Sequence, residues 1–251
     1  MRAPNQLVHS RARARQRYAL FPLEGFPTSR LPSWENAEAF VLAAPALGAN
    51  FVQYLANVQE SGGCAYRADG RTETFLFILS GGGRLELDDG NLSSLTAGSF
   101  ALIPPTRGFD LSIDEPTSLL ALRKVYEPSS GIEMYESLVG NAANTTASAW
   151  MNNEHSRLQT LIPDDLRYDL AMNIFTFESG HGLPYVETHV MEHGLLMLEG
   201  KGMYYLDGEW MEVEKDDFLW MGSYCPQSFY ATGPTPAKYI YYKNVNREIA
   251  L

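Results

Sequence analysis

The sequence predicts an all-β protein built from two tandem copies of one antiparallel β-domain, and three observations support this. Short apolar or alternating runs dominate the chain, and Gly, Pro, Asp or Asn separate most of them. Segments with helical periodicity are few. An internal repeat indicates two copies of the same unit. Many short strands spaced by about 8–12 residues are typical of a β-sandwich or barrel.

The predicted strands follow one another from residue 51 to residue 245. They are FVQYLANV (51–58), TFLFILS (74–80), GRLELDD (83–89), SFALIPP (99–105), LLALRKVY (119–126), MNIFTFES (172–179), YVETHVMEHGLLMLEG (185–200), GMYYLDG (202–208), DFLWMGS (217–223) and KYIYYKNV (238–245). Before them, WENAEAFVLA (34–43) is the only plausible helix, although part of it also fits a strand.

The repeat relates residues 74–105 to residues 193–224. When the two stretches are aligned, Gly81 falls on Gly200, and both copies alternate strands with glycine or Asp-Gly turns. The stretch between the copies, residues 128–157, is rich in Asn, Ser, Thr and Ala and shows little periodicity. We therefore expect an N-terminal domain with an arm over residues 1–127, a linker over 128–157 and a C-terminal domain over 158–251.

The amino-acid composition limits the classes of partner that we expect for this protein. Among 251 residues, 30 are Asp or Glu and 19 are Lys or Arg, which gives a net charge of −11 and no basic block for nucleic acid. No apolar run approaches the roughly 18 residues of a membrane span. The two cysteines, Cys64 and Cys225, fall in different halves and form no CxxC pair. A reducing cytoplasm fits this use of cysteine, and a single disulfide between the two remains an alternative.

The N-terminus, MRAPNQLVHSRARARQRY, is basic and has no acidic residue before Glu24. It has no hydrophobic region and no small-residue cleavage site, so it is not a secretory signal. We expect an exposed arm that packs on a neighbouring subunit or domain. A homo-oligomer is the expected state of assembly.

Candidate site residues concentrate in VETHVMEHGLLMLEG (186–200). Glu187, His189 and His193 occupy odd positions, so on an extended strand they share one face. Burying these groups unpaired would cost several kcal/mol. Two interpretations remain, a hydrogen-bonded polar cluster or a metal site. Gln227 follows His193 at a distance at which a hairpin sheet folds it back onto the first strand of the copy.

These residues carry a family resemblance. Glu187-x-His189-xxx-His193-x6-Gly200 has the spacing of the first cupin motif, and YLDGEWMEVEKDDFLWMGSYCPQ resembles the second, with Gln227 in place of the last histidine. The order Glu, His, His, Gln resembles the (S)-ureidoglycine aminohydrolase family of bicupins. RYALFPLEGF, ETFLFILSG and YIYYKNVNRE extend the resemblance along the chain. It implies two tandem antiparallel β-barrel (jelly-roll) cupin domains.

The resemblance implies that Glu187, His189, His193 and Gln227 hold one metal ion. The first copy departs from this pattern, because the alignment sets Ala68, Gly70 and Thr74 opposite the first three ligands, and Arg107, Gly108 and Phe109 near the fourth. We therefore expect the N-terminal copy to be metal-free and structural. Carboxylate and amide oxygens with imidazole nitrogens form a hard donor set that suits Mn²⁺, and the resemblance also implies manganese.

The last strand adds candidate substrate contacts. In KYIYYKNVN the odd positions Tyr239, Tyr241 and Lys243 share a face, which looks either into the barrel or toward solvent. The resemblance implies that Glu187, Gln227, Tyr239 and Lys243 contact the substrate and that Lys243, Tyr239 and Glu187 are catalytic. Three alternative roles remain for Lys243: general acid, general base, or anchor of the substrate carboxylate.

The implied reaction replaces the α-amine of ureidoglycine by hydroxyl, which gives (S)-ureidoglycolate and ammonia, a late step in purine and allantoin catabolism. The implied partner is thus a small-molecule substrate. One alternative is another metal bicupin enzyme, a dioxygenase or decarboxylase acting on a small carboxylic acid. Another is a non-catalytic cupin that binds a small ligand, because the fold alone does not decide function.

Overall fold

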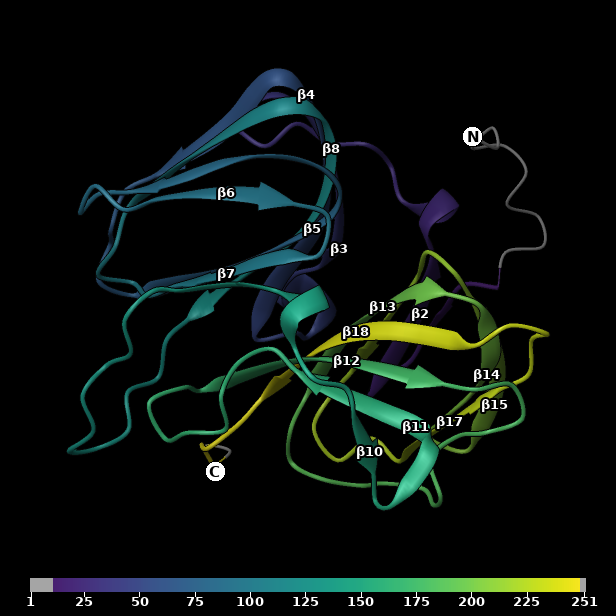
Figure 1. The fold of residues 1–251 in the computed structure, drawn as a ribbon. Helices are drawn as coiled ribbons and strands as arrows, with labels where there is room; N and C mark the ends of the chain where they lie inside the picture. Colours follow the sequence, from purple (N-terminus) through teal and green to yellow (C-terminus); the bar gives the residue numbers. More distant parts are fainter. Residues whose placement is uncertain (1–10, 249–251) are drawn as a thin grey trace. The chain divides into compact units, whose positions relative to one another are not determined.

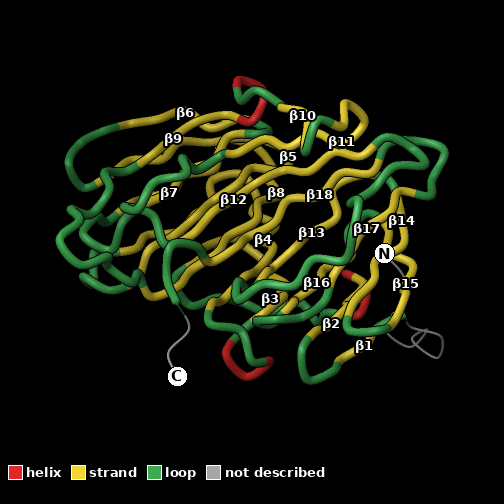
Figure 2. The backbone as a smooth tube through the Cα atoms, turned by 90° about the horizontal axis from the view of Figure 1, so that it is seen from below, coloured by secondary structure: helices red, strands yellow, loops and turns green. Residues whose placement is uncertain are grey.

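The computed structural model describes residues 11–248, and residues 1–10 and 249–251 lie outside the described part. Strands dominate the described chain, with three short 3₁₀ helices at Leu23–Gly25, Pro45–Leu47 and Ala142–Asn144 (Figure 2). All strand pairings are antiparallel, so the predicted all-β class is confirmed. A search of the described residues finds no helix long and apolar enough to cross a membrane.

The chain divides into two compact units whose boundaries differ from those expected. One unit is Pro27–Asn144, and among the described residues the other combines 11–26 with 145–248. The described part of the N-terminal arm, residues 11–26, therefore belongs to the second unit and not to the expected first domain, 1–127. The expected linker, 128–157, is also partly structured, because it contributes strands to both units.

The Pro27–Asn144 unit is one sheet with the order β3-β4-β8-β5-β7-β9, and β6 pairs with β5. Its strands are β3 Trp34–Ala43, β4 Phe51–Tyr66, β5 Thr72–Leu87, β6 Leu92–Thr96, β7 Ser99–Ile103, β8 Phe109–Val125 and β9 Leu138–Asn141. The long strands β4, β5 and β8 bend around a core that includes Leu76, Ile78 and Leu119.

The helix considered for residues 34–43 is wrong, because this segment is the strand β3. Its residues pair along β4, from Trp34 opposite Cys64 to Ala43 opposite Gln53, with two register shifts. The helical pattern of the segment is weak, and strand pairing with burial of Trp34 and Leu42 overrides it.

The second unit contains an eight-stranded sheet, β1-β2-β16-β13-β18-β12-β11-β10, and a three-stranded sheet, β15-β14-β17. Its strands are β1 Arg13–Ala14, β2 Tyr18–Pro22, β10 Ser148–Trp150, β11 Asn153–Thr160, β12 Leu170–Phe177, β13 His193–Glu199, β14 Lys201–Leu206, β15 Glu209–Glu214, β16 Asp217–Met221, β17 Gln227–Ala231 and β18 Ala237–Asn244. The two sheets enclose an aromatic core that includes Phe177, Phe229 and Tyr239.

The N-terminal segment is built into this second unit. β2 pairs with β16, from Tyr18 opposite Met221 to Pro22 opposite Asp217 (Figure 1, purple strand). Ahead of β2, the Arg11 guanidinium donates to both carboxylate oxygens of Asp217 and to Glu214 Oε1 at 2.9 Å. The described part of the basic arm thus packs on a domain of its own chain.

Asp217 is the buried end of this contact, since its side chain is 2 % exposed. Burial raises the pKa of Asp217, and the hydrogen bond from Arg11 opposes that shift. The carboxylate also accepts the backbone N–H of Glu214 at 2.8 Å. Arg11 therefore neutralises a carboxylate that water does not reach.

We predict that Arg11→Met lowers the free energy of unfolding by about 1–3 kcal/mol, because it leaves a buried carboxylate with only one backbone donor. In a chain of this size the melting temperature should fall by several degrees, which differential scanning calorimetry would measure. Arg13→Met is the matched control, because Arg13 is exposed and its guanidinium donates to the Ala12 carbonyl but forms no ion pair with another residue of 11–248. Equal melting temperatures for the two variants would contradict the role of Arg11.

Candidate metal and active site

All six residues predicted for the site lie around one cavity of the second unit. The cavity has a volume of about 540 Å³. The side chains that line it include Glu187, His189, His193, Gln227, Tyr239 and Lys243. The structure therefore brings together side chains that are up to 56 residues apart in the sequence.

The route by which Glu187 and His189 reach the cavity differs from the one expected. Residues 186–192 do not form a regular strand, and β13 begins only at His193. Glu187 forms an isolated bridge with Gln227, with backbone N–H···O distances of 2.8 and 2.9 Å. The chain then bends, with the Tyr224 N–H donating to the His189 carbonyl at 2.7 Å. Glu187, His189 and His193 therefore line one cavity, but they do not share a face of one strand as the sequence predicted.

The bend has a simple cause, because this segment passes from one sheet to the other. Glu187 pairs with Gln227 at the start of β17, in the three-stranded sheet, whereas His193 pairs with Met221 and Lys243 in the eight-stranded sheet. A straight strand cannot belong to both sheets, and strands that change sheets bend at the crossing.

Two imidazoles and one amide converge in the cavity. His193 Nε2 lies 3.3 Å from His189 Nε2, and Gln227 Nε2 lies 3.1 Å from His189 Nε2. Two nitrogens bound to one ion at about 2.1 Å and a right angle would lie about 3 Å apart. The spacing of the two imidazole nitrogens is therefore close to that of two ligands of one metal ion.

The tautomer of His193 is fixed by its surroundings. His193 Nδ1 lies 3.0 Å from the carbonyl oxygen of Tyr242, which can only accept, so Nδ1 carries the proton and Nε2 offers its lone pair to the cavity. The side chain is 4 % exposed. Burial lowers the pKa of His193 to about 3, with His189 as the next cause. A neutral imidazole oriented through its second nitrogen is what a metal ligand requires.

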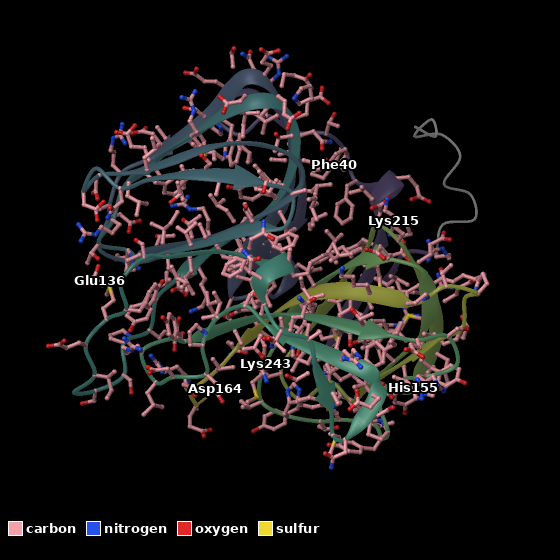
Figure 3. The ribbon with its side chains drawn as sticks, in the orientation of Figure 1. Phe40, Glu136, His155, Asp164, Lys215 and Lys243 are labelled. Carbon is pink, nitrogen blue, oxygen red and sulfur yellow. The ribbon has the colours of Figure 1, made fainter. Side chains whose placement is uncertain are left out.

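Glu187 and Lys243 form the charged part of the site. Burial raises the pKa of Glu187 and Lys243 opposes the shift, while burial lowers the pKa of Lys243 and Glu187 opposes that shift. Each group therefore helps to keep the other charged. Asp164 also opposes the lowering of the Lys243 pKa, and Figure 3 shows both side chains on the same side of the unit.

The donor set fits a metal ion, and three of its four members are already converged. Within residues 11–248, no three His, Cys, Asp or Glu side chains lie close enough to hold an ion as they stand, so the Glu187 carboxylate does not yet join the histidines. The Gln227 amide presents Nε2 to His189, while Oε1 accepts from the Tyr204 hydroxyl at 3.5 Å. A half-turn of the amide would exchange its two ends and offer an oxygen ligand.

The last strand presents its odd positions to the cavity. β18 sets Lys243 opposite His193 and Tyr239 opposite Met197. Tyr239 is 2 % exposed and packs among Phe175, Phe177 and Phe229, so most of its ring belongs to the core. Burial raises the pKa of Tyr239 well above its ordinary value, and the phenol stays protonated. Lys238 points the other way, with Nζ 3.6 Å from Glu199 Oε1.

Tyr204, Tyr241 and Trp150 are among the side chains that line the cavity without having been predicted as site residues. Tyr204 donates to Gln227, Tyr241 accepts from the Asn173 amide at 3.2 Å, and Trp150 packs edge-on against Phe175. Tyr241 was detectable, since it lies between Tyr239 and Lys243 on the same face. Trp150 was not, because it lies in the stretch interpreted as a linker.

Comparisons with known proteins identify the family of the chain. Residues 173–242 match the cupin domain family. A curated (S)-ureidoglycine aminohydrolase from Escherichia coli (strain K12) is 32 % identical over 93 % of this chain and 90 % of its own length. A probable (S)-ureidoglycine aminohydrolase from Oryza sativa subsp. japonica is 33 % identical over 92 % of this chain and 74 % of its own.

The chain belongs to the (S)-ureidoglycine aminohydrolase family. Among solved structures, a putative glyoxylate induced protein from Pseudomonas aeruginosa is 34 % identical, with a TM-score of 0.88 over 98 % of this chain and 94 % of that one. The predicted bicupin β-barrel fold is therefore confirmed. Membership of this aminohydrolase family does not by itself assign the individual site residues, whose roles stay predictions.

We predict that this family member binds one divalent metal ion per chain and that His193→Ala abolishes binding while the chain stays folded. The variant loses one of four donors, but both β-cores remain, and its circular dichroism should match that of the wild type. Elemental analysis after dialysis would measure metal content. His181→Ala is the control, because His181 stacks on His155 outside the donor set. Two equivalents of metal per chain would contradict the single site.

Proposed function

We propose that this protein is a metal-dependent hydrolase that converts (S)-ureidoglycine and water to (S)-ureidoglycolate and ammonia in purine catabolism. The observation that carries the proposal is family membership over more than nine-tenths of the chain, together with the cavity that the six expected site residues line. Cys64 and Cys225 are both free and buried, in keeping with a cytoplasmic enzyme.

The reaction exchanges one bond at the α-carbon. The bond to the amine nitrogen breaks, a bond to a water oxygen forms, and the amine leaves as ammonia after gaining a proton. The nitrogen must therefore be protonated, the water must lose a proton, and the substrate carboxylate must be held. A bound Mn²⁺ ion would supply Lewis acidity and orient the substrate.

The residues divide these tasks by charge. Lys243 is the cation of the cavity, and burial lowers its pKa, so its ammonium is a stronger acid than an exposed lysine. We assign it the delivery of a proton to the departing amine or the anchoring of the carboxylate. The Glu187 carboxylate and, after a half-turn of its amide, Gln227 would offer oxygens to the amine and ureido N–H groups. Tyr239 supplies a phenol that keeps its proton.

A dioxygenase or decarboxylase is less well supported by this site. A two-histidine, one-carboxylate triad for iron would need only Glu187, His189 and His193. Gln227 and Lys243 would then have no task, although both are held in the cavity by strand pairing. A non-catalytic binding protein would not need the charged pair of Glu187 and Lys243.

We predict that the manganese-loaded protein releases one ammonia per freshly generated ureidoglycine without consuming oxygen, and that the product is the (S) enantiomer of ureidoglycolate. A coupled ammonia assay, an oxygen electrode and chiral chromatography would measure the three quantities. Oxygen consumption, release of carbon dioxide from the substrate, or binding without turnover would overturn the proposal.

We predict that Lys243→Met lowers the rate by about a hundredfold or more, the scale for loss of an acid or a charged anchor, with metal content unchanged. Lys243→Arg separates the two roles, because arginine keeps the charge but does not give up its proton. Recovery of the rate indicates anchoring, and no recovery indicates proton transfer.

Lys238→Met is the matched control for these variants, since Lys238 lies on the opposite face of β18. Its rate should stay near that of the wild type. Equal rates for Lys238→Met and Lys243→Met would show that Lys243 has no catalytic task.

A further inference from the structure

The Pro27–Asn144 unit carries an arginine at the place where the other unit carries Lys243. His193 lies opposite Lys243 across the sheet, and its counterpart in the repeat, Thr74, lies opposite Arg123. Arg123 shares its face of β8 with Leu119 and Ala121, which belong to the buried core. Its side chain therefore starts from the interior face, as that of Lys243 does.

The place of Gln227 is taken by a phenylalanine. Gln227 lies opposite Leu206, and Phe109 lies opposite Leu87, its counterpart in the repeat. The neighbouring backbone matches as well. The Asp207 N–H donates to the Pro226 carbonyl, just before Gln227, at 2.9 Å. The Asp88 N–H likewise donates to the Gly108 carbonyl, just before Phe109, at 3.0 Å. An aromatic ring thus occupies the position at which the other unit carries the Gln227 amide.

The place of Glu187 is taken by a tyrosine. Glu187 is bridged to Gln227, and Tyr66 is paired with Phe109. The strand registers therefore set Tyr66 opposite Glu187, where the sequence alignment had set Ala68. The difference arises because Tyr66 precedes Thr74 by eight residues, whereas Glu187 precedes His193 by six.

The exchange of Glu187 for Tyr66 leaves a cation without an anion. The Arg123 guanidinium carbon lies 4.1 Å from the Tyr66 ring centroid, and Arg123 Nε donates to Thr74 Oγ1 at 3.3 Å. Within residues 11–248, no carboxylate oxygen lies within 4.0 Å of its nitrogens. Asp69 is an electrostatic neighbour of Arg123, but its carboxylate already accepts from two backbone N–H groups.

The ring beneath the guanidinium is held in place. The Tyr66 hydroxyl accepts from Ser33 Oγ at 2.9 Å and from Trp34 Nε1 at 3.2 Å, and it lies 3.4 Å from the Tyr54 hydroxyl. A guanidinium stacked on a fixed ring is pre-oriented in its own plane, and the two terminal NH₂ groups are the ends suited to a carboxylate.

A cavity of about 410 Å³ adjoins this pair. Arg123 and Tyr66 line it together with apolar side chains that include Val41, Phe51 and Val52. Lys124 also lines it, but its ammonium lies 3.5 Å from Glu73 and donates to the Val125 carbonyl at 2.9 Å. The cavity thus offers one available cation among apolar walls.

We propose that the Pro27–Asn144 unit is a binding site for a small monocarboxylate with an apolar body, held by a two-pronged hydrogen bond to Arg123 above Tyr66. A carboxylate matches the guanidinium fork, one negative charge matches one cation, and the walls fit an apolar remainder. The site is separate from the cavity around Lys243 and does not depend on the proposed hydrolysis.

Isothermal titration of the full chain with benzoate tests this proposal. The Lys243→Met chain serves as the reference, so that the carboxylate does not bind at Lys243. We expect it to bind one equivalent of benzoate, and the Arg123→Gln/Lys243→Met chain to bind at least tenfold more weakly with a similar melting temperature. Benzamide, which has the same shape without the charge, should not bind to either chain.

Two outcomes would overturn the proposal. One is the absence of saturable benzoate binding to the Lys243→Met chain, and the other is binding that Arg123→Gln leaves unchanged. If the glutamine variant fails to fold, Arg123→Lys replaces it, because lysine keeps the charge and loses the planar fork. Several-fold weaker binding of benzoate then supports the two-pronged contact, and equal binding contradicts it.

Discussion

The antiparallel pairing of β13 with β18 is the constraint on which the candidate site depends. It sets His193 opposite Lys243 and Met197 opposite Tyr239, and it brings the Tyr242 carbonyl within 3.0 Å of His193 Nδ1. A slip of one residue would turn Lys243 to the outer face and remove that carbonyl from the imidazole. The same backbone contact therefore sets the position of the cation, the tautomer of the histidine and the direction of its lone pair.

The second constraint is the crossing between sheets at residues 187–193. Glu187 is fixed to β17 and His193 to β13, so His189 lies on the bend between the two sheets. This arrangement draws donors from both walls of the barrel to one point. It also explains why the segment is irregular although its sequence alternates, since the backbone must leave one sheet before it enters the other.

The two units use one scaffold for opposite charge arrangements. Around Lys243 the cavity is lined by a carboxylate, two imidazoles and an amide. Around Arg123 the corresponding positions carry Tyr66, Thr74 and Phe109, which present rings and a hydroxyl. The first set consists of donor groups of the kind that hold a metal ion. In the Pro27–Asn144 unit, Arg123 has no carboxylate oxygen within 4.0 Å among residues 11–248. Changes at a few inward positions are enough for this difference, because the strand pairings are shared.

The sequence by itself determined the fold class and the repeat, because strand alternation and turn residues are local patterns. The six residues that line the cavity were expected from the motif spacing together with the family resemblance that it carries. Tertiary structure alone decided that residues 34–43 form a strand, since the partner β4 lies elsewhere in the chain. It also assigned Arg11–Phe26 to the second unit, through β16 and the buried Asp217. Finally, it set Tyr66 opposite Glu187, because pairing across a sheet depends on register, and loops of unequal length hide the register from an alignment of letters.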